Sequence, residues 1–140
     1  MMNTILSPLK DFAYVMLRIA SGLAFSFHGV QKLFGLYSKY PSPPFGSQMW
    51  IGGVIELVCG LAITIGLFTS LAAFLASGTM AVAYIQFHWK FAFNSRIFPG
   101  VNEGELALIY CFLFLLIACT GGGACSLDRK MSVDRARETS

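Results

Sequence analysis

Residues 49–89 read MWIGGVIELVCGLAITIGLFTSLAAFLASGTMAVAYIQFHW, and this stretch decides the fold. It contains two apolar segments, residues 49–67 and 70–89, each near the length of about 20 residues that an α-helix needs to cross a hydrocarbon core. After Gly66, only Phe68 and Thr69 separate the two segments. So short a connection requires the helices to run antiparallel and side by side. The stretch therefore predicts a transmembrane helical hairpin.

Two further apolar segments flank this hairpin. Residues 12–36 precede the segment SKYPSPP, whose prolines cannot continue a helix, and residues 104–120 end at a run of three glycines. The sequence thus predicts an all-α, integral membrane, four-helix antiparallel bundle that forms a single domain over residues 1–140. Residues 125–140 are expected to be a polar, mobile tail.

The composition supports lipid as the solvent of this chain. Hydrophobic residues make up 56% of the sequence, charged residues 12%, and the mean hydropathy is +0.66. The basic residues form no block with interleaved aromatics, which argues against a nucleic-acid partner. The four cysteines show neither a C-x-x-C pair nor the Cys/His spacing of a zinc site, so no metal site is predicted.

The distribution of basic residues predicts an orientation. With four spans, both termini lie on one side of the membrane. That side carries five basic residues against three in the opposite loops: Lys10, Arg129, Lys130, Arg135 and Arg137 against Lys39, Lys90 and Arg96. The positive-inside rule then places both termini in the cytoplasm and the chain in the cell (inner) membrane.

The first span carries a polar stripe. Its members follow one another at intervals of three or four residues, which keeps them on one face of a helix: Arg18, Ser21, Phe25, His28, Lys32 and Gly35. An ionisable group near the bilayer centre costs about 2.5–3.5 kcal/mol on insertion scales, so this face is expected to point into the bundle. Gly22 and Gly29 lie beside the stripe and would let a neighbouring backbone approach closely.

Glu56 is the most demanding residue of the second span. Gly52, Gly60 and Thr64 share its helix face, which predicts that this face packs against another helix. At about 1.5 Å per residue, Arg18 and Glu56 each lie roughly 10 Å from opposite membrane edges. We therefore predict an Arg18–Glu56 ion pair near the middle of the membrane.

Four polar residues from three of the spans are expected at a common depth. His28 and Lys32 of the first span, His88 at the end of the third and Glu105 at the start of the fourth would form one cluster. A purely structural interpretation stays open. In it Lys32 and His88 extend to the membrane surface, His28 bonds a backbone carbonyl, and Glu105 stabilises a helix N-terminus.

The ordered set of these residues resembles the DoxX family of small membrane proteins. The resemblance extends from about Leu17 to Asp128 and includes short pieces in the family order: Leu17-Arg18, residues 28–35 (HGVQKLFG), 56–60 (ELVCG), 66–69 (GLFT), His88, Glu105 and 126–128 (SLD). One departure is Ser70, where an arginine is usual in the family. The resemblance implies a four-helix membrane bundle. For members linked to thiosulfate:quinone oxidoreductase it also implies electron transfer from a sulfur substrate into the quinone pool, while other members are membrane partners of redox-defence proteins.

These observations lead to three functional hypotheses. In the first, the protein is a membrane subunit of a quinone-linked redox system. Its predicted catalytic residues are Arg18, His28, Lys32 and Glu56, and its predicted quinone-lining residues are Phe25, Tyr84, His88 and Glu105. The sequence has no haem or flavin motif, so electrons would come from a partner protein. The second hypothesis is a non-catalytic scaffold that recruits a soluble redox enzyme. The third is a small-solute or proton pathway, which would require a homo-oligomer.

Overall fold

The computed structural model describes residues 7–138. Its elements, in chain order, are η1 (Ser7–Leu9), α2 (Lys10–Phe34), α3 (Gln48–Ile65), α4 (Thr69–Ala83), η2 (Tyr84–Trp89), η3 (Ser95–Ile97), α5 (Pro99–Asn102), α6 (Glu105–Thr120) and α7 (Leu127–Glu138). The predicted all-α bundle is confirmed. Three helical segments, Ser7–Phe34, Gln48–Ile65 and Thr69–Trp89, are long and apolar enough to cross a membrane, while the apolar helix Glu105–Thr120 is shorter.

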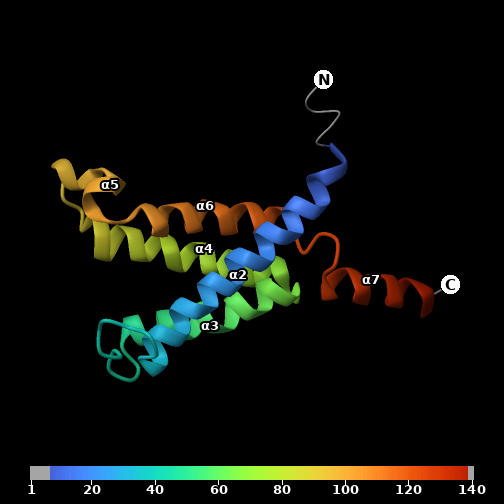
Figure 1. The fold of residues 1–140 in the computed structure, drawn as a ribbon, viewed down its shortest axis with the longest axis horizontal. Helices are drawn as coiled ribbons and strands as arrows, with labels where there is room; N and C mark the ends of the chain where they lie inside the picture. Colours follow the sequence, from blue (N-terminus) through green and yellow to red (C-terminus); the bar gives the residue numbers. More distant parts are fainter. Residues whose placement is uncertain (1–6, 139–140) are drawn as a thin grey trace.

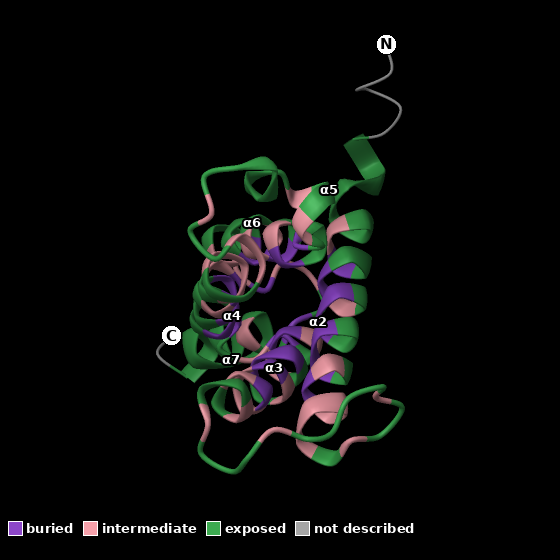
Figure 2. Ribbon diagram, turned by 90° about the vertical axis from the view of Figure 1, so that its left-hand side faces the viewer, coloured by how far each residue is buried: buried purple, intermediate pink, exposed green. Residues whose placement is uncertain are grey.

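The four apolar helices form two close pairs. Helix α2 packs along α3, and α4 packs along α6. Helices α3 and α4 meet at the short turn between Ile65 and Thr69 and then diverge toward the opposite end of the bundle (Figure 1). Figure 2 shows the buried faces of all four helices turned toward one another. This divergence creates the space in which the candidate site lies.

Glycines set the distance between α2 and α3. A Cβ atom on Gly60 would lie 2.5 Å from the Ser26 nitrogen, and one on Gly29 would lie 2.5 Å from the Leu57 nitrogen. The two backbones therefore touch where a methyl group has no room, as expected for helices that pack in lipid. The predicted packing role of Gly52 is wrong, because a Cβ there would meet no described atom within 4 Å. Its neighbour Gly53, one residue further round the helix, faces Lys32 and Leu33 instead.

Aromatic rings join the two helix pairs. Phe25 of α2 lies with its ring centroid 4.7 Å from that of Phe114 and 5.7 Å from that of Tyr110, both on α6. Tyr110 and Phe114 stack on each other at 5.2 Å. Phe25 and Phe114 are fully buried. Burial of large aromatic rings is a major contribution to packing, so this trio holds α6 against α2.

The expected mobile tail is corrected over its described part, where Leu127–Glu138 form α7. The Ser126 hydroxyl accepts a hydrogen bond from the Arg129 backbone N–H, which is the arrangement of a helix N-cap. None of the α7 residues is buried. Since α7 is polar all round, its sequence lacks the apolar periodicity from which a helix is predicted. Helix α7 lies at the end of the bundle where α2 begins (Figure 1).

Candidate functional site

Arg18 lies at the end of the bundle where the chain begins and ends, and it binds backbone carbonyls. Its side chain is fully buried and donates to the carbonyl oxygens of Ile63 at 2.6 Å, Thr64 at 3.0 Å and Cys125 at 3.0 Å. The last carbonyls of a helix lack partners and carry partial negative charge, which suits a guanidinium. The predicted Arg18–Glu56 ion pair is therefore wrong.

Asp128 completes this end of the bundle, and sequence reasoning missed it. Its carboxylate accepts from the backbone N–H groups of Phe68 and Thr69, both at 2.8 Å, and from the Thr69 hydroxyl at 2.6 Å. Partial burial alone would raise the pKa of Asp128. The hydrogen bonds from Thr69 and Phe68 outweigh that effect and hold the pKa below its ordinary value. Asp128 thus caps α4 and ties the α3–α4 turn to the start of α7.

Residue Phe68 shows why the turn needs this support. Its φ of 47° places a bulky residue in the left-handed region, which is unfavourable for any residue with a Cβ. The two bonds that the N–H groups of Phe68 and Thr69 donate to the Asp128 carboxylate fix that conformation. The signal that could have identified Asp128 was the piece Ser126-Leu127-Asp128, which the resemblance already included.

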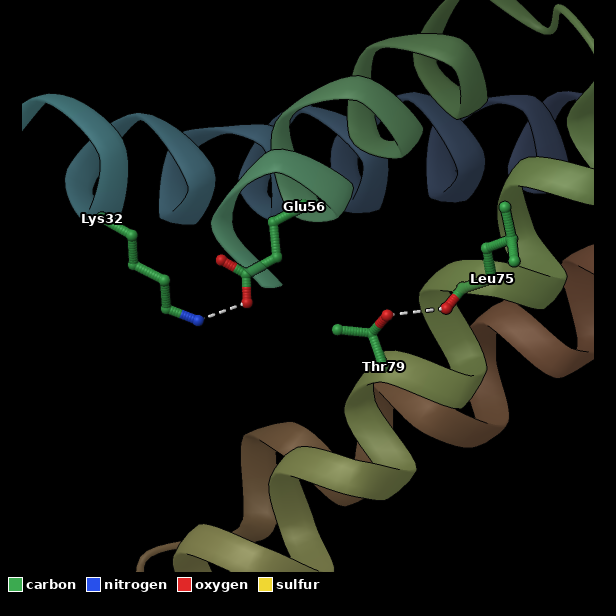
Figure 3. Close-up of polar contacts among 4 residues, drawn as sticks. All are labelled: Lys32, Glu56, Leu75 and Thr79. Carbon is green, nitrogen blue, oxygen red and sulfur yellow. Dashed lines mark hydrogen bonds and ion pairs between the residues drawn. The ribbon is translucent and has the colours of Figure 1, made fainter. Parts of the chain in front are cut away.

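Glu56 pairs with Lys32 instead of Arg18. The Lys32 Nζ lies 2.5 Å from Glu56 Oε1, and only 2% of the Glu56 side chain is exposed, against 36% for Lys32. Figure 3 shows the two side chains reaching toward each other from α2 and α3, across from Thr79 of α4. The second carboxylate oxygen, Glu56 Oε2, is buried and has no hydrogen-bond partner within residues 7–138. A buried, unpaired carboxylate oxygen is costly and calls for a ligand or solvent partner.

The ion pair lies in the wall of a cavity of about 200 Å³, here called the chamber. Its lining residues come from α2, α3, α4, η2, α6 and the segment before α6: Phe25, His28, Lys32, Glu56, Met80, Ala83, His88, Glu103, Leu106, Ala107 and Tyr110. The chamber thus brings together His28, Lys32, Glu56 and His88, with Phe25 beside them, as the sequence predicted. Glu103 and Tyr110 were missed.

Two predicted lining residues lie outside the chamber. Tyr84 donates its hydroxyl to the Ile97 carbonyl and contributes to the packing around Gly104. Glu105 is exposed and lines a neighbouring hollow with Pro99 and Gly100. Helix α6 begins at Glu105, whereas Glu103 precedes the helix with a left-handed φ of 60° and lines both that hollow and the chamber. The predicted helix start was not accurate enough to tell whether Glu103 or Glu105 lines the chamber.

His88 is oriented by a backbone contact. Its Nδ1 lies 3.1 Å from the Asn102 carbonyl oxygen. Because a carbonyl can only accept, Nδ1 carries the hydrogen, and Nε2 is then the nitrogen that can accept a hydrogen bond from a ligand. His88 belongs to η2, a six-residue π-helix. Short π-helical segments occur frequently at functional sites.

A second, larger cavity adjoins the chamber. It has a volume of about 680 Å³, lies between α3 and α4, and is here called the groove. The chamber and the groove share Lys32, Glu56, Met80, Ala83 and His88. Most of the other groove residues are apolar, and Gln48 donates to the Gln86 side chain at 2.5 Å across its wide end. The ion pair therefore lies in the wall that the chamber and the groove share.

The sequence model of the DoxX family matches residues 13–89, which is more than half of the chain. The chain belongs to the DoxX family. It is also 37% identical over 132 residues to an uncharacterized protein of Haemophilus influenzae, an alignment that covers 89% of this chain and 95% of that protein. No solved structure matches it.

Membership in the DoxX family, together with the apolar helices, makes this an integral membrane protein. The matched region spans α2, α3, α4 and η2, and so contains His28, Lys32, Glu56 and His88. The parts of the chamber contributed by Glu103 and α6, and the Asp128 cap, lie beyond the match. The resemblance noted from the sequence is thus confirmed, and the ion pair lies within the matched residues 13–89.

Proposed function

We propose that this DoxX protein is a membrane subunit of a redox system and binds a quinone in the chamber. The observation that carries the proposal is Glu56, which is 2% exposed, paired with Lys32 through one oxygen and left with a buried, unpartnered second oxygen. Arg18 Nε is also buried without a described partner, but Arg18 lines neither the chamber nor the groove. Glu56 lines both.

The chamber residues fit a quinone head group. A bound quinone would supply a carrier of electrons and protons in the membrane. Lys32 can donate a hydrogen bond to a carbonyl oxygen, while Glu56 Oε2 can accept one from the hydroxyl of the reduced form. His88 also lines the chamber, where its Nε2 can form a hydrogen bond with the ligand. The Phe25 and Tyr110 rings give the ring an apolar surface.

The electrons in this proposal come from a partner protein, because the sequence contains no haem or flavin motif. We place both termini in the cytoplasm and the protein in the inner membrane, following the distribution of basic residues. Arg18 and Asp128 then lie toward the cytoplasm and the chamber toward the opposite side. A redox partner would contact the end of the bundle nearest to the chamber.

The test is quinone binding to the purified protein in detergent, with Glu56→Gln as the variant and Glu105→Gln as the matched control. Both changes remove a carboxylate at the same end of the bundle, but only Glu56 lines the chamber. Losing hydrogen bonds to a charged group, at about 1.5–3 kcal/mol each, predicts roughly 10- to 100-fold weaker binding for Glu56→Gln. Equal affinities in the two variants would refute the proposal.

A scaffold function is the second candidate, and α7 is the observation that favours it. This helix projects from the bundle with all of its residues accessible, and Arg129 and Lys130 are exposed on it. A soluble redox enzyme with an acidic surface could dock there. The double substitution Arg129→Glu and Lys130→Glu should release such a partner in a pull-down while quinone affinity is unchanged. Retention of the partner would exclude this docking role.

A further inference from the structure

Two glycines of the groove face open space. Gly52 on α3 and Gly78 on α4 both line the groove, and a Cβ atom on either would meet no described atom within 4 Å. The glycines at the α2–α3 contact differ, because a Cβ there would clash with backbone. Gly52 and Gly78 therefore keep the groove wide, and neither lies at a close contact between helices.

The groove combines a few polar groups with a mostly apolar wall. Its polar lining residues are the ion pair, His88, Gln48 and Thr79, while its large apolar side chains are Met49, Ile51, Ile55, Phe74, Leu75, Met80, Val82 and Phe87. Phe74, Leu75 and Val82 are exposed on a membrane-spanning helix, so this side of the groove opens toward lipid. Such a cavity matches a molecule with one polar end and one hydrocarbon chain.

We propose that the groove holds the hydrocarbon chain of an amphiphile whose head group lies in the chamber and which enters sideways from the bilayer. This inference rests on the proposed quinone site and specifies its ligand as a long-chain quinone. The shared residues Lys32, Glu56 and His88 connect the two cavities, so one molecule can occupy both. The Gln48–Gln86 bond joins α3 to η2 across the wide end, which leaves the lipid-facing side as the entrance.

The volumes agree with this division. The chamber, at about 200 Å³, is smaller than the roughly 300–1,000 Å³ of typical ligand pockets, whereas the groove, at about 680 Å³, lies within that range. A head group with its chain therefore requires both spaces. The chain has no hydrophobic reason to leave lipid, so its selectivity must come from packing against the groove walls.

The experiment compares a benzoquinone that carries a decyl chain with the same head group lacking the chain. Affinities are measured in detergent by quenching of tryptophan fluorescence for the wild type, Gly78→Phe and the control Val58→Phe. Val58 is an exposed residue of α3 outside the groove. We expect Gly78→Phe to weaken binding of the chain-bearing quinone roughly tenfold or more while the chainless one binds as before. Val58→Phe should leave both affinities unchanged.

Two further variants guard against misfolding. Gly78→Ala adds one methyl group and should keep the wild-type preference for the chain, while Gly52→Phe fills the groove from its other wall and should reproduce Gly78→Phe. If the chainless quinone binds but both phenylalanine variants bind the two quinones as the wild type does, or lose both equally, the groove proposal is overturned and the quinone site stands. If the wild type binds neither quinone, both proposals fall.

Discussion

Lys32→Met should destabilise this protein more than Glu56→Gln, although each substitution removes one member of the same ion pair. The reason is the unequal burial of the partners, with 2% of the Glu56 side chain exposed and 36% of the Lys32 side chain. Loss of Lys32 leaves the Glu56 carboxylate buried with neither oxygen paired, because Oε2 already lacks a partner. Loss of Glu56 leaves an ammonium group on a flexible stem that can reach the surface.

The magnitudes follow from this asymmetry. Breaking a buried pair by removing one partner costs about 3–5 kcal/mol. Because Lys32 is partly screened by its exposure, we expect the lower end, about 3 kcal/mol, for Lys32→Met and about 1 kcal/mol or less for Glu56→Gln. In the double variant neither position carries a charge. It should therefore be more stable than Lys32→Met alone, with a coupling energy of roughly 1–2 kcal/mol.

The measurement is unfolding from detergent micelles with increasing SDS, followed by the helical circular dichroism signal. The wild type, both single variants and the double variant are compared under one set of conditions, so that the reference state is shared. Two results would refute the reasoning: a loss of stability for Glu56→Gln as large as that for Lys32→Met, or a double variant whose loss equals the sum of the single ones.

Three further predictions concern the packing of the bundle and the end where Arg18 and Asp128 lie. Asp128→Asn should cost about 1 kcal/mol at neutral pH, because an amide has only one oxygen to accept the hydrogen bonds that Phe68 and Thr69 donate to the two carboxylate oxygens. Because the Asp128 pKa is lowered on folding, its contribution is complete above the ordinary carboxyl pKa and disappears as the pH falls through the folded value, so the difference in Tm from the wild type should shrink below about pH 4. Arg18→Lys should lose about 2 kcal/mol, since an ammonium cannot reproduce the forked bonds to Ile63, Thr64 and Cys125, while quinone affinity of the folded protein stays unchanged; weaker quinone binding would contradict a purely structural role. Gly60→Val should cost about 1–3 kcal/mol or more by forcing α2 from α3, whereas Gly52→Val should be tolerated, and equal SDS unfolding midpoints for the two would contradict the helix contact described above.

The helices were predictable because their signals are local. The apolar lengths, the short Phe68-Thr69 connection and the glycine stop after Thr120 each depend on neighbouring residues. When η2 is counted as the end of the third span, every end of the four spans lies within two residues of its prediction. The inward polar face of α2 was also predictable, since its spacing of three and four residues is a property of one helix. Arg18, Phe25 and Lys32 indeed face other elements of the protein.

The partner of Glu56 was not predictable in this way, because it depends on the register between two helices. That register is set where Gly60 meets Ser26 and Gly29 meets Leu57, which places Glu56 opposite the part of α2 around residues 28–32. Arg18 and Lys32 lie 14 residues apart on α2, about 21 Å along the helix at roughly 1.5 Å per residue. The predicted depths of Arg18 and Glu56 did not require their side chains to meet, and Lys32 is the basic residue that lies level with Glu56. Several glycines could have formed the contact, and the sequence alone does not say which ones pair.

Asp128 and α7 were missed for a different reason. Their helix is stabilised by a cap and by bonds to a distant turn, and neither leaves a periodic pattern in the sequence. A polar segment after a membrane span is ordinarily interpreted as a tail, and only the bonds to Phe68 and Thr69 show that this one holds the bundle together.

Substitutions at the two ends of the bundle therefore test different properties: stability at the Arg18 end and ligand binding at the Glu56 end. Substituting Arg18 could distinguish the scaffold hypothesis from the quinone hypothesis only if Arg18 were part of the quinone site. The bonds of Arg18 instead hold the end of α3 and the segment before α7. Its loss would damage the fold under either hypothesis. Glu56→Gln is the discriminating change, because it retains a side chain of similar size and leaves Lys32 able to reach the surface. A variant that keeps wild-type stability but loses quinone affinity would establish a binding role for Glu56, whereas one that keeps both would leave the ion pair without a function in quinone binding.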